Sequence, residues 1–173
     1  MRYVELRRHT DNDGDRLSSQ GIAAAEVIGR DGLNPPYASF VSSGATRSTQ
    51  MLEILRSAAG QDGTPIIEAA GLRSSVEDRW RAAAKTAGKG ADLEAIREVD
   101  ADLVDRESWL LGVTLREIVD ALPDGGRALV VGHSPMNEAA VLGLTGEVVP
   151  PLGKGEGILV IEDSGHHGVE PLG

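Results

Sequence analysis

Two arginines and two histidines stand just after short apolar runs of the sequence, and their side chains suit the binding of an oxyanion. Arg8 and His9 follow the first run, Arg47 lies in SSGATR, and His133 follows ALVVG. Arginine presents a planar fork of N–H donors that matches phosphate-like oxygens, and it keeps its charge at any working pH. Histidine can donate a hydrogen bond or, when neutral, act as a nucleophile. Brought together, the four would form a compact anion site that contains a nucleophile.

The segments that carry these residues alternate between strand and helix patterns. The expected strands are residues 2–6, 38–42, 64–69, 127–134 and 157–163. The expected helices run from Ser18 or Ser19 to Gly32, with Ile22, Ala25, Val27 and Ile28 facing inward, and then over residues 44–60, 74–88, 92–99, 101–122 and 135–146. This alternation predicts a three-layer α/β/α fold with a largely parallel central sheet. Ligands of such sheets bind beyond the carboxyl ends of strands, where RRHT, SSGATR and GHSP lie.

Composition limits the classes of function. The 173 residues suit one domain, 1–173, in which residues 72–102 depart from simple strand–helix alternation and form a possible lid. A formal charge of −10 disfavours nucleic acid and anionic membranes as partners. The chain has no cysteine, no signal-like start and no apolar run near ~18 residues, which predicts a cytoplasmic protein. The oligomeric state is not predicted.

Four short motifs carry a resemblance to a known family. LRRHT resembles the Arg-His-Gly signature of the histidine phosphatase superfamily, also called phosphoglycerate mutase-like. SSGATR is similar to its Ser-x-x-x-Arg element, VVGHSP to its second histidine after a late strand, and RLSSQG to its Leu-Thr-x-x-Gly helix start. The motifs occur in the family's order between residue 3 and about residue 140. Thr10, where the family has a small residue, and Met51, where it has a threonine, depart from the pattern.

The resemblance implies a mechanism and a set of site residues. His9 would attack phosphorus and become a phosphohistidine, while Arg8, Arg47 and His133 would hold the phosphoryl oxygens. Glu77 is the expected proton donor and Glu68 the alternative. Thr10, Asp15 and Ser134 are the expected further contacts to substrate. Neither a metal nor a cofactor is expected, since the cations do the work of a metal and the adjacent His166 and His167 rarely share one ion.

Three activities remain as alternatives. A phosphatase is preferred over a mutase because this short chain has little room for the segments that cap a mutase pocket. The substrate would be a small phosphomonoester, a sugar phosphate or a phosphoprotein carrying phosphohistidine, and the length and Asp15 favour the phosphohistidine-phosphatase type. A phosphate-binding module without turnover is the second alternative. A serine esterase built on GHSPM is the third, but Pro135 after the serine lacks the N–H that an oxyanion hole needs.

Several other residues have structural interpretations. Ser74 and Glu77 have the spacing of a helix capping box. Arg7 alternates away from Arg8 along the first strand, so we expect it in solvent or in a salt bridge. Trp80 and Trp109 lie on helical patterns and are expected to be buried or in contacts. The Gly/His/Pro-rich end of the chain is expected to fray.

Overall fold

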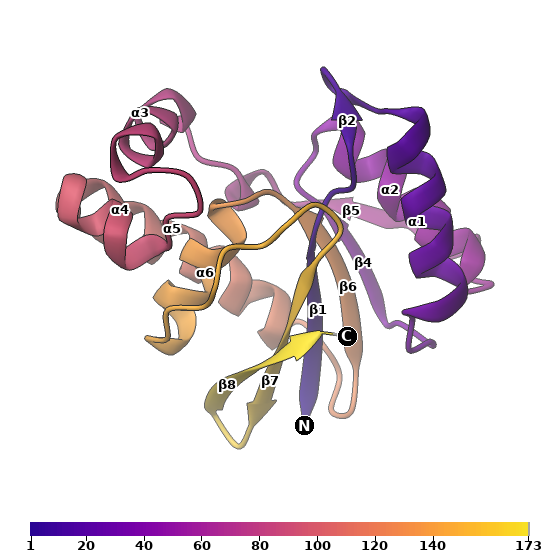
Figure 1. Cartoon of the computed structure of the whole chain (residues 1–173). Coiled ribbons are helices and arrows are strands. Elements are labelled where there is room, and N and C mark those ends of the chain that lie inside the picture. Colours follow the sequence, from indigo (N-terminus) through magenta and orange to yellow (C-terminus); the bar gives the residue numbers. More distant parts are fainter. Residues whose placement is uncertain (173) are drawn as a thin grey trace.

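A mixed six-stranded sheet forms the centre of the computed structural model, which describes residues 1–172 (Figure 1). The strands are β1 (Arg2–Arg8), β4 (Ser39–Ser42), β5 (Ile66–Glu68), β6 (Arg127–Gly132), β7 (Gly157–Asp163) and β8 (His166–Leu172). Their order is β5-β4-β6-β1-β7-β8. The first four are parallel, whereas β7 and β8 pair in antiparallel fashion. The predicted α/β class with a largely parallel sheet is therefore confirmed.

Helices cover both faces of the sheet. Helices α1 (Ser19–Asp31) and α2 (Thr46–Ala58) lie on one face, next to the small β2 (Asn12–Asp13) and β3 (Arg16–Leu17) hairpin. The other side carries η1 (Ala70–Leu72), α3 (Glu77–Ala87), α4 (Leu93–Val99), α5 (Ala101–Asp120) and α6 (Met136–Thr145). Each side has its own apolar cluster, centred on Phe40 and Leu52 in one and on Leu103 and Val130 in the other. Within residues 1–172 no helix is both long and apolar enough to span a membrane.

The expectation for Arg7 is wrong. Its side chain points to the α1 side of β1 and is only 4% exposed. Nη1 donates to the Gly155 carbonyl at 3.0 Å and Nη2 to the Gly32 carbonyl at 3.2 Å. Alternation along the strand did place Arg7 opposite Arg8, but in a central strand both faces are covered, so the side chain is buried. Arg7 joins the end of α1 to the loop that precedes β7.

The expectation that the C-terminal end frays is also wrong, because residues 166–172 form β8. This strand pairs with β7 from Asp163↔His166 to Gly157↔Leu172. Ser164 and Gly165 have φ of 52° and 84°, as a tight hairpin turn requires. Val169 packs against the larger apolar cluster. Short-range hydropathy did not reveal this strand because HHGVEPL contains no regular apolar alternation and includes Gly168 and Pro171, which are uncommon inside strands.

The inward face of α1 differs from the expected one. Of the four residues expected to face inward, Ala25 is buried and Ile28 packs against the apolar cluster, but Ile22 and Val27 are exposed. Gly21 and Gly29 are buried in their place. A Cβ on Gly29 would lie 2.7 Å from that of Ala58, so small residues allow α1 and α2 to approach closely. The two tryptophans also differ: Trp80 is buried, as expected, but Trp109 on α5 is 67% exposed.

Candidate functional site

The two histidines of the motifs follow the ends of neighbouring parallel strands. In the ladder between β1 and β6, Arg8 pairs with Gly132, and the His9 N–H donates to the Gly132 carbonyl at 3.1 Å. His9 and His133 are therefore the next residues in the same register. Their imidazole centroids lie 5.3 Å apart with an interplanar angle of 67°. The sheet itself brings together two residues that are far apart in sequence.

His9 has the geometry of a neutral imidazole with one free nitrogen. Its Nδ1 lies 2.8 Å from the Thr10 carbonyl, and because a carbonyl only accepts, Nδ1 carries the proton. The unprotonated Nε2 then accepts a hydrogen bond from Arg47 Nε at 3.2 Å. Burial, followed by the charges of Arg47 and Arg8, lowers the pKa of His9 to about 4, although the hydrogen bond to Thr10 opposes this. At neutral pH the lone pair on Nε2 is available for attack.

Arg47 connects the parts of this site. It lies in the first turn of α2, whose N-terminus carries a positive partial charge that favours an anion. Besides its bond to His9, it reaches His133 Nδ1 through Nη2 at 3.3 Å and Asp15 through Nη1 at 2.8 Å. The Asp15 carboxylate is 61% exposed, so this ion pair lies at the rim. One guanidinium therefore contacts both imidazoles.

His133 is held from behind by two serines. Because Nδ1 accepts from Arg47, Nε2 carries the proton and donates to Ser43 Oγ at 2.7 Å, and Ser43 in turn donates to Ser48 Oγ at 3.1 Å. Burial, followed by the charges of Arg47 and His9, lowers the pKa of His133 to about 3. The sequence analysis did not single out Ser43 and Ser48, although both belong to or adjoin the SSGATR motif. A bound anion would offset these cationic charges and raise the pKa of His133.

Arg8 is fixed by the loop before β7. Its Nη1 donates to the Leu152 carbonyl at 2.7 Å, and the Gly155 N–H donates to the carbonyls of Arg8 and His9 at 3.1 and 3.2 Å. Thr10 faces the other way: its Oγ1 donates to the Gly21 carbonyl at 2.8 Å, its side chain is buried, and it does not line the cavity. This loop and α1 together fix the segment that contains His9.

One cavity of about 310 Å³ contains the converging groups. It is lined by Arg8, His9, Arg47, Glu77, Trp80, Arg81, Ala84, His133, Ser134, Pro135 and Met136. The strand ends supply its floor, and α3 supplies the facing wall. Of the residues expected to bind substrate, Ser134 lines this cavity, whereas Asp15 reaches it only through Arg47.

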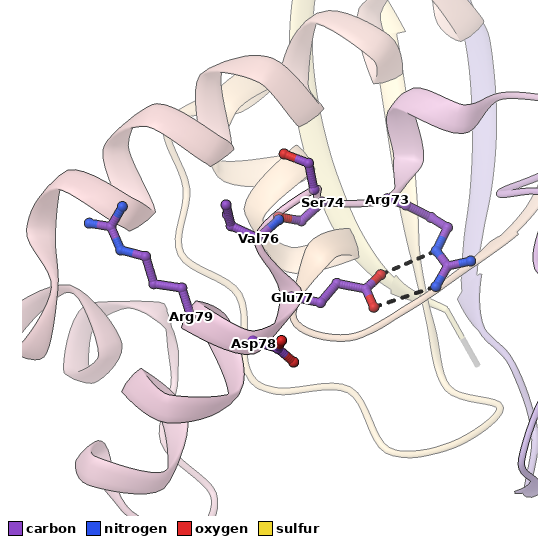
Figure 2. A pocket seen from close by; sticks show the side chains of 7 residues that line it. Arg73, Ser74, Val76, Glu77, Asp78 and Arg79 are labelled. Carbon is purple, nitrogen blue, oxygen red and sulfur yellow. Dashed lines mark hydrogen bonds and ion pairs between the residues drawn. The ribbon is translucent and has the colours of Figure 1, made fainter.

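The two glutamates proposed as proton donors have different positions. Glu77 lines the cavity. Its two oxygens accept hydrogen bonds from Arg73 Nε at 3.2 Å and Nη2 at 3.4 Å, which Figure 2 shows in another hollow, lined by residues 73–79. Glu68 is exposed at the end of β5, near Gly44, and does not line the cavity. The predicted capping box is absent, because Val76 is the N-cap of α3 and Ser74 Oγ bonds Glu107 instead.

The cations of α3 divide into two groups. Arg79 points away from the cavity and makes a pair of 2.7 Å hydrogen bonds to Asp100. Arg81 lines the cavity, and Lys85 lines an adjoining hollow of about 780 Å³ that shares Arg8 with it. The expectation that residues 72–102 form a lid stays a prediction, but α3 is the part of that segment that lies beside the site.

The serine esterase constellation is not assembled. The Ser134 hydroxyl donates to Glu138 rather than to a histidine. Because β7 runs antiparallel to β1, with Arg7 opposite Gly157 and Arg2 opposite Glu162, the turn after Glu162 lies at the end of the sheet remote from His9. Asp163 and His166 or His167, which the esterase would need as its acid and base, lie at or beside that turn.

Comparisons with known proteins support the fold. Neither the family models nor the curated proteins that were searched match this sequence. Among solved structures, a phosphoglycerate mutase from Bacillus anthracis str. Sterne has a TM-score of 0.75 at 18% identity, covering 98% of this chain and 91% of its own. A phosphoserine phosphatase from Entamoeba histolytica in complex with phosphoserine has 0.69 at 13%, covering 98% and 95%. The protein histidine phosphatase SixA, complexed with tungstate, has 0.59 at 19%, covering 97% and 94%.

Proposed function

On the premise that the chain has the phosphoglycerate mutase-like fold of the histidine phosphatase superfamily, we propose that it is a metal-independent phosphatase. It hydrolyses a phosphomonoester or phosphohistidine through a covalent phosphohistidine on His9. The supporting observation is the meeting of an unprotonated His9 Nε2 with Arg8, Arg47 and His133 around one cavity. A nucleophile surrounded by fixed N–H donors is what transfer of a phosphoryl group requires.

Phosphoryl transfer to the enzyme begins when the substrate displaces the internal hydrogen bonds of the site. Arg47 exchanges its bond to His9 Nε2 for a phosphoryl oxygen, which frees the lone pair. His9 Nε2 then forms a bond to phosphorus as the bond from phosphorus to the leaving oxygen breaks. Arg8, Arg47 and His133 hold the three remaining oxygens and stabilise their charge, and for this His133 takes up a proton on Nδ1, because its Nε2–H already donates to Ser43. The Nδ1–H bond to Thr10 keeps the ring oriented throughout.

The leaving oxygen needs a proton, and Glu77 is the proposed donor. It lines the cavity on the wall formed by α3, opposite the floor that carries His9. Its two bonds from Arg73 must open or rearrange before it can donate, which ties proton delivery to the position of α3. In the second half of the reaction, the carboxylate accepts a proton from water, the water oxygen bonds to phosphorus, and inorganic phosphate leaves His9.

The substrate class follows from the proposed chemistry and from the neighbouring structures. One of them acts on phosphohistidine in proteins and another binds phosphoserine, by their names. We therefore propose either a small phosphorylated compound or a phosphoprotein as substrate. We prefer a phosphatase to a mutase because two of these neighbours are phosphatases by name. Length does not separate the two activities, since the phosphoglycerate mutase from Bacillus anthracis is matched over 91% of its own chain.

Hydrolysis of p-nitrophenyl phosphate in the presence of a chelator tests the proposal. The wild-type protein should release p-nitrophenol, and acid quenching with labelled substrate should trap an acid-labile phosphoenzyme. His9→Ala should lose both signals, whereas His166→Ala, which changes an exposed histidine of β8, should keep both. Full activity of His9→Ala would refute the nucleophile. Anion binding without any turnover would indicate an inert module, and transfer to an added alcohol in preference to water would indicate a mutase.

A further inference from the structure

Glu138 is a buried carboxyl group that the proposed mechanism does not use. It lies in the first turn of α6 and is 3% exposed. Its Oε2 accepts a hydrogen bond from Ser134 Oγ, and its Oε1 is buried and makes no hydrogen bond of normal geometry among the described residues, although the N–H groups of Glu138 and Leu152 lie close enough to favour the ionised form. A buried ionised carboxylate with an unsatisfied oxygen is costly, whereas a neutral carboxyl group tolerates the same surroundings better. The geometry therefore favours the protonated form.

The surroundings of Glu138 raise its pKa on balance, because burial outweighs the groups that lower it. Burial raises the pKa of Glu138, while the Ser134 hydrogen bond, the N–H groups of Glu138 and Leu152, and the charge of Arg8 lower it. Arg8 comes from β1, Leu152 from the loop before β7, and Ser134 from the turn before α6. Among these, Arg8 is the one charged group. A proton on Glu138 thus persists to higher pH than on an ordinary glutamate.

Ser134 connects this carboxyl group to the cavity, because its side chain lines the same cavity as His9. A serine hydroxyl has one proton to donate. When Glu138 is ionised it accepts that proton, and Ser134 can only accept hydrogen bonds from the cavity. When Glu138 is protonated it donates to Ser134 Oγ, and the serine proton is free to point into the cavity.

We propose that Glu138 is a positioning residue that sets the direction of the Ser134 hydroxyl, so that Ser134 donates a hydrogen bond to a bound oxyanion when Glu138 is protonated. The inference rests on the proposed function insofar as the cavity must bind an oxyanion. Phosphoryl and sulfate oxygens are acceptors, so Ser134 adds one donor to those of Arg8, Arg47 and His133. The anion's charge in turn favours the proton on Glu138, and binding takes up protons.

Sulfate binding measured from mildly acidic to alkaline pH tests this, because the charge of sulfate does not change in that range. Isothermal titration calorimetry should show wild-type affinity that falls by about tenfold as pH rises and Glu138 ionises, the worth of one hydrogen bond to a charged group. Glu138→Gln should lose this tenfold change, because its amide donates permanently to Ser134 Oγ, and the pH dependence that remains belongs to His133, whose pKa the bound anion raises. In the unliganded site the two cavity histidines are neutral above about pH 4.

Two further variants separate positioning from a structural effect. Ser134→Ala should bind sulfate about tenfold more weakly than the wild type at low pH and should lose the tenfold change with pH, and adding Glu138→Gln to it should change nothing more. Glu107→Gln is the matched control, because Glu107 is also buried and accepts from a serine, Ser74, but does not line this cavity. It should keep the wild-type pH profile.

The outcomes distinguish the inference from the function on which it rests. Wild-type pH dependence in Glu138→Gln would overturn the role of Glu138, and so would independent, multiplying effects of the two substitutions. Sulfate binding by the wild type without pH dependence would overturn it while leaving the anion site intact. A wild type that binds no sulfate would overturn both. Should Glu138→Gln fail to fold, Ser134→Ala alone decides, since a pH dependence as large as the wild type's in that variant contradicts the inference.

Discussion

Removing Arg47 should affect rate and proton binding together, because this guanidinium contacts both cavity histidines. Arg47→Ala takes away the donors at 3.2 Å from His9 Nε2 and at 3.3 Å from His133 Nδ1. In the proposed transition state the same donors hold phosphoryl oxygens. The loss of one such positioned donor costs ~10²–10³ in rate, or about 2.7–4 kcal/mol. Arg47→Ala should therefore lower kcat/KM for p-nitrophenyl phosphate by at least ~10².

Arg47→Ala should also change the pKa values of the two imidazoles. Arg47 lowers the pKa of His9, now about 4, and of His133, now about 3. Without it both pKa values should rise, but they should stay below the usual 6.5, because burial is the larger cause in each case. Titration of the imidazole signals by NMR measures these shifts directly. Arg47→Lys keeps the charge but loses the fork, so it should restore most of the pKa depression and little of the rate.

The reasoning would be refuted by either of two results. Activity of Arg47→Ala within about threefold of wild type would show that the guanidinium does not hold the transferring group. Unchanged pKa values of both histidines would show that the contacts in the empty site are absent in solution. Arg30→Ala is a suitable control, because Arg30 is exposed in the last turn of α1.

Three further outcomes are expected. The free energy of unfolding should fall as pH drops from about 6.5 towards 4, because the unfolded chain protonates its histidines there while His9 and His133 stay neutral when folded. Each histidine contributes on the order of 3 kcal/mol to this fall, which urea denaturation measures. In His133→Gln the fall should be smaller. Glu77→Gln should lower turnover of an alkyl phosphate by ~10² or more but hardly that of p-nitrophenyl phosphate, whose leaving group needs no proton; equal losses on both would exclude Glu77 as the donor. Arg7→Leu should destabilise the fold by about 2–3 kcal/mol in urea, because two carbonyls lose a charged donor; a change below about 0.5 kcal/mol would contradict that role.

The grouping of the site residues at the carboxyl ends of the parallel strands was predictable, because it depends on local sequence patterns and one topological rule. Apolar runs ending in RRHT and GHSP indicated strands, and parallel strands present their carboxyl ends on the same edge. That was enough to expect Arg8, His9, Arg47 and His133 near one another. Their mutual contacts, through Nε of Arg47 and Nδ1 of the second histidine, depend on rotamers that the sequence does not reveal.

Interactions between distant segments were not predictable in the same way. The two carbonyls that Arg7 contacts belong to glycines 25 and 148 residues later, so no short-range periodicity indicates that the arginine is buried. Glu138 lies five positions after the second histidine, on a helix whose sequence pattern gives no sign that this residue is buried. Its burial depends on the packing of α6 beside the loop before β7. The capping-box motif was misleading because Ser74 Oγ donates to Glu107 of α5 and accepts from the N–H of Val76, the N-cap residue, so that it does not cap the N–H of Glu77.

The pairing of β1 with β6 determines how well the separation of the two imidazoles tolerates substitutions in the core. Neighbouring strands are separated by roughly 4.8 Å, and this constant of backbone geometry closely matches the 5.3 Å between the two rings. The separation of the imidazoles is thus inherited from the peptide ladder, not from any particular choice of apolar side chains underneath. Extensive replacement of the interior should leave that separation unaltered, provided that Arg8 stays opposite Gly132. An engineer who wished to transplant the pair would need two adjacent parallel strands, each extended by one histidine, and the hydrogen bonds that fix the two rings.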